Sequence, residues 1–213
     1  MTIVLMVALL TVLAILSVPG RISRNPFTGI QLNNLESLVF QRALAVILIL
    51  SVLTIEIHEP SHWWGLPGSA LLAVLATLVI VPLLSIRILR NSTDPRQEAL
   101  FGQIAQGGRE KVFYLAATSM YMIAYEILMR GVVLHDLTDR MDIIPAVTVN
   151  TILYAGMHVP KNLREALLCI PLGVFLCWLT IYTRSVWPAA VFHLTFALCF
   201  ELGYNAKLKH LNT

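Results

Sequence analysis

Seven long apolar runs alternate with short polar connections along this 213-residue chain. Most runs approach the roughly 20 residues that an α-helix needs to cross a bilayer. The chain is 57% hydrophobic and only 13% charged, whereas soluble domains carry about 25% charged residues. The pattern predicts an all-α, polytopic membrane protein with about seven transmembrane spans. These spans are roughly residues 2–18, 38–57, 69–89, 113–134, 143–159, 166–183 and 186–204.

Basic residues gather in the connections on one side of these spans. By the positive-inside rule the basic side is cytoplasmic, so we expect the N-terminus outside and the C-terminus inside, in a bacterial inner (cytoplasmic) membrane. The formal net charge of +3 is small and forms no basic stripe, so we expect the lipid bilayer as a partner and no nucleic acid. Arg140 and Arg184 fall on the other side. The basic side holds Arg21, Arg24, Arg87, Arg90, Arg96, Arg109, Lys111, Lys161, Arg164, Lys207 and Lys209.

Residues 58–62 read His-Glu-Pro-Ser-His, which matches the letters of the zinc-protease motif HExxH. That motif requires a helix, on which both histidines share a face. Pro60 would break such a helix, so we interpret 58–68 as an external loop with interfacial tryptophans. The three cysteines lie within apolar runs and lack metal-ligand spacing, which favours small buried residues. They are Cys169, Cys177 and Cys199.

The fourth span contains Glu126 and Arg130 inside an otherwise apolar run. Residues four apart share a face of a helix and can pair. A charged pair within a membrane span is costly and indicates a functional site. The pair fits a structural ion pair, a carboxylate that activates water, or the proton path of a transporter or channel subunit.

Two later spans each bring one histidine. Tyr154 precedes His158 by one helical turn, and His193 lies about two turns into the last span. A histidine buried at that depth needs a partner, and Glu126 in the fourth span is a candidate. The sequence therefore predicts an intramembrane polar pocket around Glu126, His158 and His193. His158 lies nearer the cytoplasmic end, so the pocket requires helix tilt or a helix that continues past Pro160.

These segments resemble the CPBP family (CAAX protease and bacteriocin-processing), also called the ABI family of intramembrane endopeptidases. The family pattern is Glu-Glu-xxx-Arg, then Phe-xxx-His, then His-xxx-Asn or Asp on successive spans. The stretch from Thr183 to His193 also resembles the Trp-Pro-Ala lead into the family's last histidine. The resemblance covers about residues 113–200. The matching segments are Tyr125-Glu126-xxx-Arg130, Tyr154-xxx-His158 and His193-xxx-Ala197.

The resemblance implies an endopeptidase that cleaves membrane-tethered protein or peptide substrates. Its catalytic residues are then Glu126, His158 and His193, with Arg130 and Tyr125 in the first motif. In the family the first glutamate and the histidine of the second motif activate water, while the last histidine and the Asn stabilise the oxyanion. Zinc held by His158, His193 and Glu126 fits this set, and so does water activation without a metal.

Two positions depart from the family pattern. Tyr125 replaces the first glutamate, and Ala197 replaces the closing Asn. A tyrosine is a poor general base near neutral pH because its hydroxyl ionises only at about pH 10. Adjacent helix positions point about 100° apart, so Glu126 cannot simply replace the missing first glutamate. A rotation of the helix would restore a site, and so would Asn150 or Thr195 in place of a missing motif side chain. The alternative is an inactive pseudoprotease that binds or regulates a membrane partner.

The same observations divide the chain into three regions. Residues 1–112 form an N-terminal three-span region with a cytoplasmic loop. Residues 113–204 form a four-span core that carries the candidate site, and residues 205–213 form a cytoplasmic tail.

Overall fold

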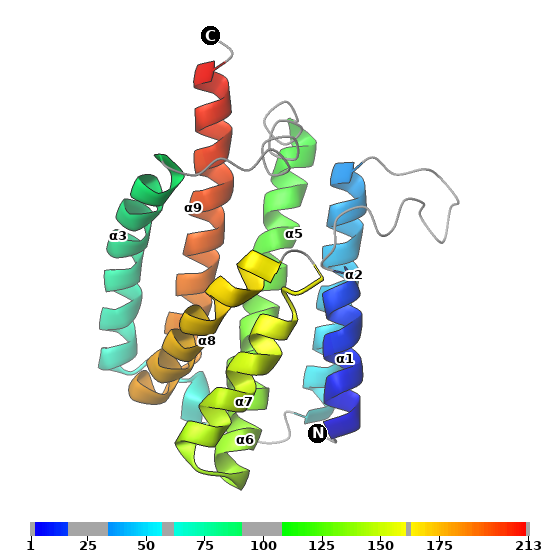
Figure 1. Cartoon of the computed structure of the whole chain (residues 1–213), viewed down its shortest axis with the longest axis vertical. Coiled ribbons are helices and arrows are strands. Elements are labelled where there is room, and N and C mark those ends of the chain that lie inside the picture. Colours follow the sequence, from blue (N-terminus) through cyan, green and yellow to red (C-terminus); the bar gives the residue numbers. More distant parts are fainter. Residues whose placement is uncertain (1–2, 17–33, 57–61, 91–107, 161–162, 212–213) are drawn as a thin grey trace.

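The computed structural model describes residues 3–16, 34–56, 62–90, 108–160 and 163–211, and within these ranges it holds helices and turns but no strand (Figure 1). This confirms the predicted all-α fold, and each predicted apolar run coincides with a helix. The main helices are α1 (Ile3–Leu16), α2 (Asn34–Glu56), α3 (Gly68–Arg90), α5 (Arg109–Glu126), α7 (Ile143–Gly156), α8 (Leu163–Thr183) and α9 (Trp187–Leu211).

Of the helices within the described ranges, four are long and apolar enough to cross a membrane. They cover Glu36–Thr54, Gly68–Ser85, Lys111–Arg140 and Leu163–Thr183. Two shorter apolar helices cover Ile143–Gly156 and Trp187–Phe200. The chain is thus an integral membrane protein. The structure supports four full-length spans by length and composition, where the sequence predicted about seven.

The helices form an elongated bundle in which α1 begins at one end and α9 ends at the other (Figure 1). Helix α2 packs along α5, α3 packs along α9, and α7 packs along α8. Helix α8 crosses the bundle obliquely rather than in parallel with α5 (Figure 1). Helices α5 and α9 also contact each other, and this contact brings the first and last predicted motifs together.

The helix that carries the first motif changes its winding directly after Glu126. Helix α5 continues into the π-helical segment η2 (Ile127–Val133) and then into α6 (Leu134–Arg140), with helical backbone angles at both junctions. In η2 the Met129 carbonyl accepts the Leu134 N–H. The same carbonyl accepts a 2.8 Å hydrogen bond from Asn150 Nδ2. Such π-helical segments are rare and are frequent at functional sites.

The connection between α2 and α3 is anchored on the start of α9. Residues 57–61, which include most of the His-Glu-Pro-Ser-His stretch, lie outside the described residues. His62–Trp64 form one 3₁₀ turn, η1. The Trp187 indole donates a 2.9 Å hydrogen bond to the Trp64 carbonyl, and the Ser185 hydroxyl donates one of 2.7 Å to the Gly65 carbonyl. These bonds hold Trp64 against η2.

Gly131 in η2 permits this close approach. A Cβ atom at position 131 would lie 3.1 Å from Cη2 of Trp64, whereas one at Gly156 would meet no atom within 4 Å. We expect Gly131→Val to destabilise the protein by about 1–3 kcal/mol through overpacking. Thermal unfolding in detergent micelles measures this loss, with Gly156→Val as the matched control. Equal losses in both variants, or no recovery when Trp64→Ala is added to Gly131→Val, would contradict the contact.

Candidate active site

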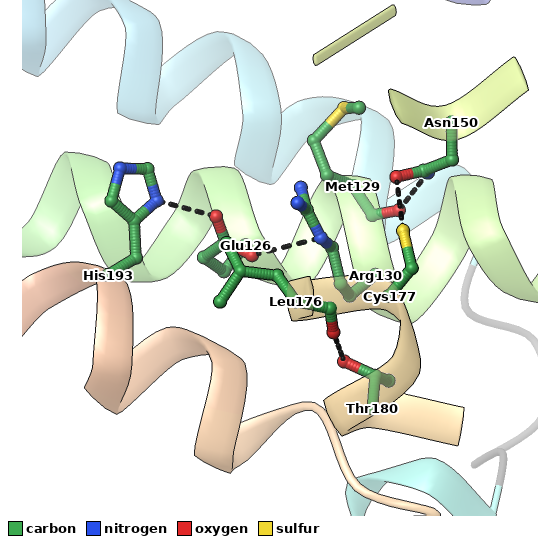
Figure 2. A network of polar contacts seen from close by, with 8 residues as sticks. All are labelled: Glu126, Met129, Arg130, Asn150, Leu176, Cys177, Thr180 and His193. Atoms are coloured by element: carbon green, nitrogen blue, oxygen red, sulfur yellow. Dashed lines mark hydrogen bonds and ion pairs between the residues drawn. The ribbon is translucent and has the colours of Figure 1, made fainter. Parts of the chain in front are cut away.

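Glu126 lies at the last position of α5, and its side chain is completely buried. Figure 2 shows its two carboxylate oxygens directed to different partners. Oε1 lies 2.6 Å from Nδ1 of His193 on α9, and Oε2 lies 3.3 Å from Nε of Arg130 on η2. Glu126 therefore contacts both Arg130 of its own motif and His193 of the last motif.

The partners of Glu126 determine which nitrogen of His193 carries a proton. An ionised carboxylate only accepts hydrogen bonds, and the adjacent Arg130 guanidinium favours the ionised form. With Glu126 as a carboxylate, His193 Nδ1 is the donor in the 2.6 Å bond to Glu126. In the neutral imidazole this leaves Nε2 with a free electron pair, which accepts a proton. His193 is itself buried, at 6% exposed, so the Glu126–His193 pair lies inside the helix bundle.

Arg130 is buried as completely as Glu126. Its guanidinium carbon lies 4.6 Å from the centre of the Tyr154 ring, so the cation stacks on the aromatic face. Cation–π contacts of this kind are attractive and strengthen when water is excluded. The carboxylate on one side and the ring on the other fix the guanidinium in place.

Two tyrosine rings surround His193. The Tyr125 ring centre lies 6.3 Å from that of His193, edge-on, and the Tyr154 ring centre lies 5.9 Å from it. Tyr154 also contacts His158, with ring centres 5.3 Å apart. Tyr154 therefore contacts both histidines. Tyr125, Tyr154 and His193 contact one another, because the Tyr125 and Tyr154 ring centres are also only 6.1 Å apart.

His158 lies in the turn that follows α7, where its backbone N–H bonds to the Ala155 carbonyl. The position is near the helix end, as the sequence predicted, and the helix does not continue past Pro160. Nδ1 of His158 lies 2.7 Å from Oε1 of Glu165 at the start of α8. His158 therefore contacts the centre through the Tyr154 ring, while its Nδ1 pairs with Glu165.

The predicted zinc ligands can be tested by their arrangement. Among the described residues, no group of three or more His, Cys, Asp or Glu side chains is placed to hold a metal ion. Glu126 already faces Arg130 and His193, and His158 faces Glu165. Glu126, His158 and His193 do not fit a zinc ion in this arrangement, and we derive no catalytic step through a metal.

Asn150 does not take a vacant position in the site. Instead it connects three helices, because its amide donates to the Met129 carbonyl and its carbonyl accepts the Cys177 thiol at 3.2 Å (Figure 2). Sequence reasoning also missed Glu165, although a carboxylate in the first turn of an apolar span, seven residues after His158, is a visible signal. Ala197 lies on α9, and its methyl side chain cannot donate a hydrogen bond.

The comparison with family models matches residues 109–199 to the family described as type II CAAX prenyl endopeptidase Rce1-like. This range contains every residue of the candidate site. The match confirms the resemblance to the CPBP family. Comparison with curated proteins gives no match, and comparison with solved structures gives none either.

Proposed function

Since residues 109–199 match the model of the Rce1-like family of type II CAAX prenyl endopeptidases, we propose that this protein is an intramembrane endopeptidase that uses His193 as its general base. The observation that carries the proposal is the 2.6 Å bond between His193 Nδ1 and Glu126 Oε1. A carboxylate that orients an imidazole and stabilises its protonated form is an established way to make histidine an effective base.

This arrangement supplies a base although Tyr125 replaces the first glutamate of the family motif. Glu126 is buried, and both of its oxygens are engaged, so it positions His193 rather than attacking water itself. Arg130 pairs with the second oxygen. The family motif has its base at position 125, whereas under this proposal Glu126 orients the base, His193.

The proposed reaction is hydrolysis of a peptide bond. His193 Nε2 takes a proton from water while the water oxygen attacks the carbonyl carbon, and the protonated imidazole is stabilised by Glu126. The C–N bond then breaks, and the proton passes from His193 to the departing amine. The products are a new carboxyl end and a new amino end, with no net gain or loss of protons at the enzyme.

The location of the centre supports a membrane-tethered protein or peptide as substrate. Glu126 and Arg130 lie within the candidate span Lys111–Arg140, where a soluble substrate has no access. The proposal places the protein in a bacterial inner membrane, N-terminus outside and C-terminus cytoplasmic, because basic residues concentrate in one set of connections. Under it, no nucleic acid takes part.

The test is cleavage of a prenylated CAAX-type peptide by the purified protein in phospholipid vesicles, with products identified by mass spectrometry. Cleavage by the wild-type protein that disappears in His193→Ala supports the proposal. If the wild type leaves the peptide intact, or if the variant cleaves it equally well, the proposal fails for this substrate class.

A pseudoprotease is the second candidate, and Tyr125 is the observation that favours it. The Tyr125 ring is buried against His193 and Tyr154, in the motif position of the family's first glutamate. In that case the wild-type protein binds the peptide without cutting it, and Tyr125→Glu creates activity.

The Tyr125→Glu variant separates the two candidates because they predict opposite changes. If His193 is the base, a second carboxylate beside Glu126 adds like-charge repulsion in a buried site, and cleavage falls about tenfold or more. Rates of peptide cleavage for the two proteins at equal membrane content decide between them. A rise in activity would support the pseudoprotease.

A further inference from the structure

Three side chains beside the His193–Glu126 pair have buried donors with no hydrogen-bond partner in the part of the chain that the structure describes. They are Arg130, through Nη1 and Nη2, and the hydroxyls of Tyr125 and Tyr154, of which Arg130 and Tyr125 belong to the first motif. Arg130 is 0% exposed and Tyr125 is 3% exposed. Nearly all buried polar groups in proteins are hydrogen-bonded, and leaving one unsatisfied is costly. Donors left unsatisfied in this way point to an acceptor on a ligand.

The contacts of Arg130 leave its two terminal nitrogens available for such a ligand. Nε faces Glu126 at 3.3 Å, and the guanidinium carbon lies over the Tyr154 ring, 4.6 Å from its centre. A structural ion pair with Glu126 would use the terminal nitrogens as well, in the two-pronged geometry that Arg and carboxylate prefer. The ion pair with Glu126 is made through Nε instead.

The Tyr125 ring is fixed on several sides. It stacks on Tyr121 with ring centres 5.9 Å apart and contacts Tyr154 and His193. Both Arg130 and Tyr125 border the Tyr154 ring, since the Arg130 guanidinium carbon lies 4.6 Å from its centre and the Tyr125 ring centre lies 6.1 Å from it. The two sets of donors are therefore held in fixed positions near the imidazole that would activate water.

Fixed donors that include a cation suit an oxygen on which negative charge develops. This inference rests on the proposed endopeptidase function. Peptide hydrolysis needs such donors, and here His193 Nδ1 already bonds to Glu126, while Ala197 has no side-chain donor. We propose that Arg130 and Tyr125 form the binding site for the carbonyl oxygen of the peptide bond that is cut. The oxygen accepts their hydrogen bonds and carries the negative charge of the tetrahedral intermediate, until the C–N bond breaks and the carbonyl re-forms.

Tyr125→Phe tests the site without changing charge or ring packing. We expect kcat for the prenylated peptide to fall about 100-fold, the usual loss of one oxyanion donor, with KM changed less than twofold. Tyr121→Phe is the matched control, since it removes a hydroxyl one turn away on the same stack of rings, and it should retain wild-type kcat. If Tyr125→Phe also retains wild-type kcat while His193→Ala loses activity, the proposed site is wrong and the endopeptidase function stands.

Binding of a phosphinic peptide, an uncleavable mimic of the tetrahedral intermediate, tests the site independently of activity. The probe is the same prenylated peptide with a phosphinic group in place of the scissile bond, and the readout is the rise in Tm. We expect a rise for the wild type and Tyr121→Phe that is largely lost in Tyr125→Phe. This outcome would support the site even if the wild type cleaves nothing, in which case the endopeptidase function alone would fail. An equal rise in all three proteins, or no rise in any, would overturn the site.

Discussion

Cleavage by a His193→Ala variant is expected to fall by about 10³- to 10⁴-fold, the range associated with removing a positioned general base. His193 supplies the nitrogen that takes the proton from water. Ala197, one turn later on α9, has only a methyl group and cannot act as a base in its place. Initial rates on the prenylated peptide in vesicles, at matched protein content, measure the loss.

Glu126→Gln should lower the rate by at least about 100-fold, because glutamine cannot stabilise the protonated imidazole as a carboxylate does.

His135→Ala is the matched control for this loss. His135 lies on α6, contacts the Trp63 ring and pairs with Asp139, away from the Glu126 centre. This variant should cleave as the wild type does. Loss of His193→Ala from the membrane fraction would indicate a structural role for His193, and a cleavage rate close to that of the wild type would exclude it as the base.

Arg130→Met is expected to destabilise the protein by about 3–5 kcal/mol, because breaking a buried ion pair leaves one charge uncompensated. The Glu126 side chain is 0% exposed, and without Arg130 the ion-pair partner left to its carboxylate among the described residues is His193. Methionine keeps much of the apolar volume of the arginine stem, so the loss reports mainly the charge. Thermal unfolding in detergent micelles measures it.

The double variant Glu126→Gln with Arg130→Met separates charge from packing. Because both charges are removed together, most of the stability lost in Arg130→Met should return. A double variant no more stable than Arg130→Met would show that the single change acts through packing on Tyr154. Arg140→Met serves as the control, since Arg140 forms a largely exposed pair with Asp136, and exposed pairs contribute about 0–1 kcal/mol.

The helices were predictable because the length of each apolar run directly indicates a helix. The Glu126–Arg130 pair was predictable as well, because residues four apart on one helix lie on the same face whatever the helix packs against. The Glu126–His193 contact could be inferred only in outline. These residues lie 67 positions apart, and their meeting depends on how α5 and α9 pack and rotate, which hydrophobic spacing does not encode.

Other features depended on packing that leaves little trace in the sequence. The π-helical segment 127–133 receives a hydrogen bond from Asn150, whose amide reaches the Met129 carbonyl from another helix. The pairing of His158 with Glu165 depends on the turn between α7 and α8. Motif matching placed His158 beside the glutamate, whereas the structure shows that the fold turns its Nδ1 toward α8.

The central claim is that Glu126 makes His193 a base, and the position of the imidazole proton tests it most directly. Solid-state ¹⁵N NMR of histidine-labelled protein in vesicles distinguishes Nδ1–H from Nε2–H, and the His193→Gln variant assigns the signal. We predict that near neutral pH His193 carries its proton on Nδ1, with Nε2 unprotonated, and that Glu126→Gln shifts this signal. A proton on Nε2 alone, or a His193 signal unchanged by Glu126→Gln, would contradict the account.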